Sequence, residues 1–510
     1  MKLKNYILLF CCAGLFACKK TIDLYPLSNL NTGTYYSNLE EVKSGLTGVY
    51  NAMQKPLLYE WQFTELRSDN SKQGSPGSTN AQNRDLSDLD MFIPATTQVP
   101  IYNYWLTSYN TIRNANIILQ KLGVVYDPAV GSISFQDITI PITEVDRKQL
   151  AGEALVIRAF NYFNLVRLYG GVFLVHEALS PAQAKTMSRS SVDEIYKLIT
   201  ADLSAAAANM KNQKFNQIPA ADLGRATIWA AKGLLAKVYL TQNKKAEAIT
   251  LLQDIITNSG HALQPTYAGV FNITSEMNSE IIFAVRYKAG GLGLGSTFGN
   301  TFGPLGSGSN VINGDGDGLN YPTADLDTLT NGDLRKPTLI AVYQNQLYVK
   351  KYLFPVTLND DGESDWPILR YADILLMLAE AQGYTQPSLD LINATRQRAG
   401  LGLLTMANTT SVSQFEQALS TERRIEFAFE NQRWFDLVRY NTTLTTITAE
   451  QSIKDHYAEE YYAHYRLYLP PTPTLAQLQG SVTHDRLLLP IPQKEIDTNT
   501  QLVITQNPSY

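Results

Sequence analysis

The chain contains three cysteines among its 510 residues, and all three lie near its beginning, at Cys11, Cys12 and Cys18. If the chain is cleaved before Cys18 and that cysteine is lipidated, no free thiol remains. The remainder then has no disulfide, no cysteine nucleophile and no thiolate metal site. A chain of this length buries enough surface to be held together by its own core instead.

Long hydrophobic runs are also lacking, since no segment offers the roughly 20 apolar residues that span a bilayer. The apolar run Ile7–Leu15 follows two lysines and precedes Ala17 and Cys18, a pattern typical of a bacterial lipoprotein signal. An ordinary secretory signal that is cleaved elsewhere is the alternative. We therefore predict that residues 1–17 are a signal peptide, that Cys18 is lipidated, and that the protein is anchored by lipid and otherwise soluble.

Neither sign of charge is in large excess, with 42 basic and 47 acidic residues. Residues 1–17 include two of the lysines, so the mature chain has 40 basic and 47 acidic residues, a net charge near 40 − 47 = −7. The absence of a basic cluster disfavours nucleic acid as a partner. The five histidines have no metal-ligand spacing and no Ser-His-Asp set can be identified, so we expect no cofactor.

Helical periodicity dominates what the sequence does contain. It predicts a mainly α fold, with helices over 38–54, 102–122, 148–170, 190–210, 224–240, 244–258, 370–384, 388–399, 413–430 and 432–440. In one helix pair, Ala236, Tyr239, Ala248 and Leu252 match the spacing of a tetratricopeptide repeat. Small residues at such places allow helices to approach closely and to stack into a curved scaffold. An ordinary helical hairpin is the alternative.

Two stretches lack this periodicity. Residues 67–100 are rich in Ser, Asn, Gly and Asp and are predicted to form a long loop. In the stretch from about 261 to 367, a predicted strand over 281–287 is followed by eleven glycines between Gly290 and Gly318. Such a glycine content disfavours a regular helix. We expect long loops that lie on the helical scaffold and form a ligand-binding face.

Sugars present apolar C–H faces and many hydroxyls, so a sugar site needs flat aromatic rings together with amide or charged side chains. Twenty-nine tyrosines supply such groups in abundance. The candidate ligand-binding residues in or beside the loops are Trp61, Asp69, Asn70, Tyr287, Phe298, Asn300, Asp317, Tyr321 and Trp366. For each of them a purely structural role is the alternative.

One segment of the glycine-rich stretch is similar to the start of a calcium-binding loop. Asn313, Asp315 and Asp317 alternate with glycines, as oxygen ligands do in such loops. The twelfth position is Ala324 rather than glutamate, with Asp325 one residue late. A polar turn with solvated aspartates is the alternative to a calcium site.

Arginines and acids alternate in the later helices. Glu422 and Glu426 lie one helical turn apart beside Arg423 and Arg424, which favours structural ion pairs over the two free carboxylates of a glycosidase. We expect buried or half-buried ion pairs between helices, made by Arg370, Arg396, Arg398, Arg423, Arg424, Arg433 and Arg439 with Asp373, Glu380, Glu422, Glu426, Glu430 and Asp436.

An ordered set of motifs accompanies the signal pattern. These motifs are ALVIRAFNY at 154–162, LYGG at 168–171, AAKGLLAKVYL at 230–240, LRYADILLMLAEA at 369–381, NATRQRAGL at 393–401, ERRIEFAFE at 422–430, RWFDLVR at 433–439, LPIP at 489–492 and QNPSY at 506–510. In this order and over essentially the whole chain, they resemble the SusD/RagB family.

The resemblance implies a single domain over 18–510, with a helical scaffold at about 36–260 and 368–445, a loop-rich insert at about 261–367 and a C-terminal segment at 446–510. It also implies a non-catalytic lipoprotein on the exterior of the outer membrane. Such a protein binds oligosaccharides or other nutrients and passes them to a TonB-dependent, SusC-like transporter. The alternatives are a helical-repeat adaptor with protein partners only and a surface glycoside hydrolase.

Overall fold

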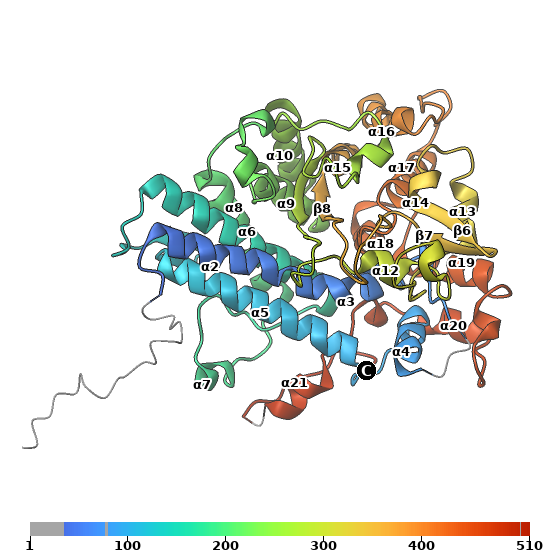
Figure 1. Ribbon diagram of the computed structural model, residues 1–510, viewed down its shortest axis with the longest axis horizontal. Coiled ribbons are helices and arrows are strands. Elements are labelled where there is room, and N and C mark those ends of the chain that lie inside the picture. Colours follow the sequence, from blue (N-terminus) through green and yellow to red (C-terminus); the bar gives the residue numbers. More distant parts are fainter. Residues whose placement is uncertain (1–34, 77–79, 500) are drawn as a thin grey trace, which may run out of the picture.

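A computed structural model describes residues 35–76, 80–499 and 501–510. The predicted signal peptide and Cys18 therefore lie outside the described residues. The described part is mainly helical, as predicted, and the strands are few and short (Figure 1). Within these ranges, none of the helices combines the length and the apolar character that crossing a membrane requires.

The N-terminal half of the scaffold consists of long helices that pack side by side. They are α2 (Leu39–Ala52), α3 (Gln54–Thr64), α4 (Ala81–Asp90), α5 (Val99–Lys121), α6 (Glu144–Tyr169), the short α7 (Pro181–Ala184) and α8 (Val192–Asn209). Helix α5 packs against α2, α3 and α6, and α6 packs in turn against α8. Ser191 begins α8 with a capping box, in which its hydroxyl accepts from the Glu194 backbone N–H and the Glu194 carboxylate accepts from the Ser191 backbone N–H.

The scaffold continues through a second series of helices. They are α9 (Ile228–Thr241), α10 (Lys245–Asn258), α15 (Tyr371–Gln382), α16 (Gln386–Arg398), α17 (Val412–Glu426) and α18 (Arg433–Thr443). Helices α9 to α17 each contact the next, and α18 contacts α9 and forms an ion pair with α17 through Arg423 and Asp436. Ala236 and Ala248 are fully buried where α9 meets α10. A Cβ on Gly233 would lie 2.4 Å from Leu369, so glycine allows α9 to approach β8 closely. This stacking is the predicted tetratricopeptide-like arrangement.

The C-terminal segment returns to the N-terminal half of the chain. Its helices are α19 (Ala449–Glu460), α20 (Leu475–Ser481) and α21 (Gln493–Thr498). Asp90 at the end of α4 accepts hydrogen bonds from the hydroxyls of Tyr465 and Tyr468, at 2.8 and 3.0 Å. Ser481 donates to the Met91 carbonyl oxygen at 2.8 Å. These contacts fix α4 to the end of the chain.

Four antiparallel strand pairs complete the described fold, and three of them include strands of the insert. The pairs are β1 (Ser71–Lys72) with β5 (Tyr321–Pro322), β2 (Val124–Asp127) with β3 (Ser132–Phe135), β4 (Ile281–Val285) with β8 (Trp366–Arg370), and β6 (Ile340–Tyr343) with β7 (Gln346–Val349). The insert also has four short helices, α11 (Tyr267–Val270), α12 (Phe298–Phe302), α13 (Ala324–Leu329) and α14 (Lys336–Leu339). Figure 1 shows the insert, in yellow, beside α17, α18 and α19.

Two local predictions are wrong. The stretch 67–100 is not one long loop, because it contains α4 and because residues 67–71 are buried. Its polar composition reflects partners inside the protein: the Arg67 guanidinium donates to the Arg486 carbonyl oxygen at 2.6 Å and lies over the Trp434 ring. Trp61 was expected outside the helices, but it lies in α3. Distant chain segments thus bury residues 67–71, whose local sequence pattern is typical of a surface.

Candidate functional site

The segment 286–365 of the loop-rich insert begins and ends at the β4–β8 strand pair, and it contacts the N-terminal half again where β5 pairs with β1. In the β4–β8 register, Ile281 lies opposite Arg370 and Val285 lies opposite Trp366. Both strands are buried along their full length. The insert is therefore attached at its base by paired backbone, and this base fixes where its loops stand.

A cluster of buried aromatic side chains supports the loops above this base. The ring centroid of Trp366 lies 4.3 Å from that of Phe298 and 4.6 Å from that of Tyr352, on which it stacks. Trp61 of α3 meets Phe302 edge-on at 5.4 Å. Aromatic contacts of this kind add stabilisation beyond the area they bury. We call Trp61, Phe298, Phe302, Tyr352 and Trp366 the aromatic cluster.

The structure places eight of the nine candidate ligand-binding residues in the interior. The buried ones are Trp61, Asp69, Asn70, Tyr287, Phe298, Asn300, Tyr321 and Trp366. Asp317 alone among the nine has an exposed side chain. A buried side chain reaches a ligand only if the loops rearrange, so ligand contact by these eight remains a prediction. In the structure these eight are interior side chains that support the predicted ligand-binding face of the insert.

The polar members of this set have partners within the protein. Asn300 in α12 donates to the backbone oxygens of Asn313 and Asp315, at 2.9 and 2.7 Å, and holds the glycine-rich turn in place. Asp69 forms a two-point ion pair with Arg433, with both N···O distances at 2.7 Å. Burial opposes ionisation of Asp69, but Arg424 and Arg433 lower the pKa of this carboxyl below its ordinary value.

The predicted ion pairs between helices are confirmed. Arg423 of α17 pairs with Asp373 of α15 and Asp436 of α18, and Arg439 of α18 pairs with Glu380 of α15, at 2.7 to 2.9 Å.

Two further arginines outside these helices each contact several carboxylates. Arg370 of β8 contacts Glu280, Glu426 and Glu430 at 2.7 to 2.9 Å, and all four side chains are buried. Arg335 contacts both Glu422 and Glu426, at 2.7 and 2.9 Å. Burial would raise the pKa of Glu426, but Arg398, Arg370 and Arg335 together lower it. The pair Glu422 and Glu426 is thus enclosed by arginines and is not a pair of free carboxylates in a cleft.

The candidate calcium segment forms a closed turn. One oxygen of the Asp315 carboxylate accepts from the backbone N–H groups of Gly308 and Gly316 and from the Ser307 hydroxyl, at 2.7 to 3.2 Å. The two backbone hydrogen bonds lower the pKa of Asp315. Within the described ranges, no group of three or more His, Cys, Asp or Glu residues is arranged to hold a metal ion.

A group of exposed amide side chains around the half-buried Tyr343 of the insert was not predicted. The β6–β7 hairpin turns at Gln344 and Asn345, both with positive φ. The Tyr343 hydroxyl accepts from the side-chain amides of Asn310 and Gln344, each at 3.3 Å. We call Asn310, Tyr343 and Gln344 the amide cluster. Its sequence signal was available, since a short polar turn between two alternating apolar runs is typical of a hairpin.

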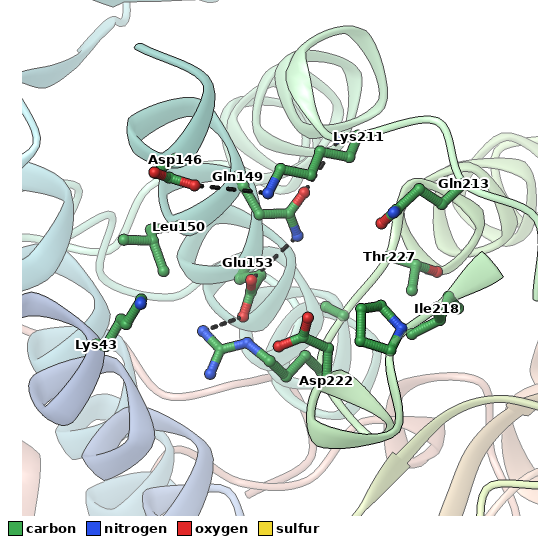
Figure 2. A pocket seen from close by; sticks show the side chains of 13 residues that line it. Lys43, Asp146, Gln149, Leu150, Glu153, Lys211, Gln213, Ile218, Asp222 and Thr227 are labelled. Atoms are coloured by element: carbon green, nitrogen blue, oxygen red, sulfur yellow. Dashed lines mark hydrogen bonds and ion pairs between the residues drawn. The ribbon is translucent and has the colours of Figure 1, made fainter. Parts of the chain in front are cut away.

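A separate pocket of about 290 Å³ lies in the helical scaffold (Figure 2). It is lined by α2, by the first turns of α6 and by the segment 211–227, and none of its lining residues belongs to the insert. Its lining is largely polar and charged. Further cavities of about 270 and 590 Å³ lie between α2 and the segment 285–288 and beside α10, α15 and α16.

Comparison with protein families assigns both halves of the chain. Residues 23–240 match the model of a SusD-like family described as "Starch-binding associating with outer membrane". Residues 340–510 match the model of the "SusD family". Together the two matches cover more than half of the chain.

Full-length relatives agree with these matches. The chain is 24% identical to "SusD-like protein P25" of Formosa agariphila, over 99% of this chain and 98% of the relative. Among solved structures, a "Laminarin binding SusD-like protein" has a TM-score of 0.74 and 25% identity, and covers 93% of this chain and 100% of its own. The "Surface glycan-binding protein A from Bacteroides thetaiotaomicron in complex with laminarihexaose" has a TM-score of 0.71 at 19% identity, over 92% of this chain and 99% of its own.

The ordered motifs, the stacked helices with a loop-rich insert, the two family matches and the full-length relatives agree with one another. The chain belongs to the SusD/RagB family.

Proposed function

We propose that this protein is a glycan-binding lipoprotein of the outer membrane that delivers oligosaccharides to a TonB-dependent, SusC-like transporter. The observation that carries the proposal is the full-length similarity to SusD-like proteins, of which one is named for laminarin and another was solved with laminarihexaose. The family description, with its association with the outer membrane, supports the location. Lipidation at Cys18 and outward display complete the proposal.

The insert is the proposed glycan-binding face. Its amide cluster places a half-buried tyrosine ring beside two exposed amides, and this combination suits a polyhydroxylated ligand. Asp317 is exposed on the same insert. In this proposal the buried members of the predicted set keep the loops in their binding shape, with direct contact by them an event that requires loop movement.

We propose a non-catalytic role because the one carboxylate pair that the sequence offered for glycoside hydrolysis has a structural function. Glu422 and Glu426 are both buried and share Arg335 as an ion-pair partner. A hydrolase of this class needs two carboxyl groups about 5–9 Å apart in an open cleft. Incubation with laminarin or starch followed by a reducing-sugar assay tests this part, and release of reducing ends would contradict it.

Glycan binding is tested by affinity electrophoresis and calorimetry on a panel of soluble polysaccharides that includes laminarin and starch. Tyr343→Ala is expected to weaken binding to the best ligand of the panel by roughly tenfold, because one ring and its hydrogen bonds are lost. Tyr462→Ala is the matched control, since Tyr462 is 70% exposed and lies in the C-terminal segment. Equal affinity of wild type and Tyr343→Ala would remove the amide cluster from the site.

The transport role is tested by purification from native outer membrane with a C-terminal tag and mild detergent. A stoichiometric TonB-dependent barrel in the eluate is the expected result. Recovery with soluble proteins only, combined with no affinity for any polysaccharide, would favour the adaptor alternative. A Cys18→Ala variant is expected to appear in the soluble fraction, because the proposed lipid anchor is lost.

A further inference from the structure

The scaffold pocket has a floor that is fixed by a buried carboxylate. Glu153 of α6 is 1% exposed and accepts a hydrogen bond from the Tyr50 hydroxyl at 2.7 Å. Gln149 donates to it at 3.1 Å, and Arg225 forms an ion pair with it at 2.9 Å. With these three partners, the two oxygens of Glu153 are satisfied. The floor is therefore rigid and already neutralised, so a ligand would bind to other groups of the pocket.

Each cation that lines the pocket already has a carboxylate partner. Lys211 lies 3.5 Å from Asp146, Lys43 lies 3.0 Å from Glu40, and Arg225 is paired with Glu153. Lys43 and Lys211 also act on Asp146 electrostatically. The positive charge at the pocket is thereby matched by acids of the protein, and an anionic ligand would have to compete with them.

Two polar side chains remain without such partners. Within the part of the chain that the structure describes, the Asp222 carboxylate and the Gln213 side-chain amide make no hydrogen bond, and Asp222 makes no close ion pair. Asp222 interacts electrostatically with Arg225, but the carboxylate that contacts Arg225 belongs to Glu153. Figure 2 shows both side chains directed into the pocket, Asp222 from below and Gln213 from the right. The polar groups of the pocket that remain free to bind a ligand are thus the Asp222 carboxylate and the Gln213 side-chain amide.

We propose that this pocket is a second ligand site, which binds a small hydroxylated primary amine such as an amino sugar. The ammonium group pairs with Asp222, and the hydroxyls bond to Gln213 and Thr227, while Leu150 and Ile218 contact the apolar face of the ligand. A charge-assisted hydrogen bond to a carboxylate is the strongest single contact available there. The volume of about 290 Å³ limits the ligand to a small molecule.

The proposal is independent of glycan binding at the insert, because the pocket and the insert share no residue. The test is a titration of the purified protein with glucosamine, glucose and N-acetylglucosamine, followed by calorimetry and by ligand-observed NMR. Glucosamine is expected to bind at least tenfold more tightly than the other two sugars, which have similar hydroxyls but no ammonium group.

Asp222→Asn is expected to reduce glucosamine affinity roughly tenfold and to leave the melting temperature unchanged, because the Asp222 side chain is exposed and makes no ion pair that supports the fold. Asp193→Asn is the matched control, since Asp193 is an exposed acid on α8 away from the pocket lining. Equal binding of all three sugars, or unaltered glucosamine affinity of Asp222→Asn, would overturn the proposal. Polysaccharide affinity measured on the same variants separates this outcome from failure of the insert as a glycan site.

Discussion

The junction of the later scaffold helices is held mainly by ion pairs and the base of the insert mainly by aromatic packing, although Arg335 and Lys351 of the insert also form ion pairs with the scaffold. At the junction of the later scaffold helices, Arg370 satisfies three carboxylates at 2.7 to 2.9 Å in the interior. In the insert, Trp366 packs on Phe298 and Tyr352 through ring contacts. Trp366 and Arg370 are only four positions apart in β8, so the same strand contributes one residue to the packing of each region.

The difference teaches how one chain can combine a fixed frame with an adaptable face. A buried arginine that serves several carboxylates tolerates little movement, because any displaced charge is left without a partner in a medium of low dielectric. Aromatic packing is less directional and tolerates small shifts. The scaffold should therefore resist change in geometry, and the insert should adjust its loops with a smaller loss of free energy.

The largest expected effect is that of Arg370→Ala. Loss of this guanidinium leaves Glu280, Glu426 and Glu430 with fewer partners in the interior, and we expect the free energy of unfolding to fall by about 3–5 kcal/mol. Urea denaturation measures it. Arg113→Ala is the control, since Arg113 is exposed and its removal should change stability by less than about 0.5 kcal/mol. Similar stability of both variants would show that the ion pairs do not hold the frame.

A loss of similar size is expected for Trp366→Ala, which addresses the insert. The cavity in the aromatic cluster should lower the free energy of unfolding by about 3–5 kcal/mol, and Trp366→Phe should lose less because one ring is kept. Hydrogen exchange is expected to rise first in residues 286–365, with α6 and α9 still protected. A stable Trp366→Ala protein with weaker glycan binding would instead favour the predicted direct role of Trp366 in ligand contact.

A pH-dependent difference between wild type and Glu65→Gln tests the interior next to the insert. Burial raises the pKa of Glu65 from 4.5 to about 8, although the Asn431 backbone N–H bonded to it acts in the opposite direction. Between these values the folded protein retains a proton that the unfolded chain releases. The contribution of Glu65 to stability is therefore complete below pH 4.5 and is lost as the pH rises through about 8.

We accordingly expect the stability of wild type relative to Glu65→Gln to fall by about 1.4 kcal/mol per pH unit between pH 5.5 and 7.5. Urea denaturation of both proteins across this range measures the slope. Parallel stability profiles would show that Glu65 is ionised in the folded protein at neutral pH.

The smallest effect on stability is expected for Gly316→Ala, with a larger effect on binding. A Cβ at Gly316 would lie 2.2 Å from the backbone of Gly303, so two loops of the insert must separate. We expect a loss of about 1 kcal/mol in stability and a clear loss of glycan affinity. Gly480→Ala is the control, because no atom lies within 4 Å of its added Cβ. Unchanged affinity would place the glycan outside these loops.

The sequence predicted the scaffold well because its helices carry strong local signals. The apolar spacing of 148–170 and the Ser191 cap correspond to α6 and α8 within one or two residues at most ends. Helix positions depend on near neighbours in the chain, which a sequence displays directly. The ion pairs were predicted from residue type alone, because arginines and acids are concentrated in the same motifs, and their partners, such as Arg439 and Glu380, lie 59 positions apart.

The candidate site was predicted less well because its exposure depends on distant segments. Asp69 and Asn70 have the composition of a surface loop, yet Arg433 and Arg424, more than 350 positions later, enclose them. Trp61 lies in α3, a helix that the local sequence pattern did not indicate. The amide cluster was missed because Asn310 and Tyr343 come together only through the folded hairpin.

The register of β4 and β8 has a consequence for how binding specificity can be changed. Because Val285 and Trp366 are paired, the segment 286–365 between them begins and ends at the same place on the scaffold. The segment is therefore an exchangeable cassette in topological terms. Transplanting residues 286–365 from a relative with a different ligand should transfer ligand preference without redesign of the helices, if the strand pair is kept together with Arg335 and Lys351, which form buried ion pairs with scaffold carboxylates.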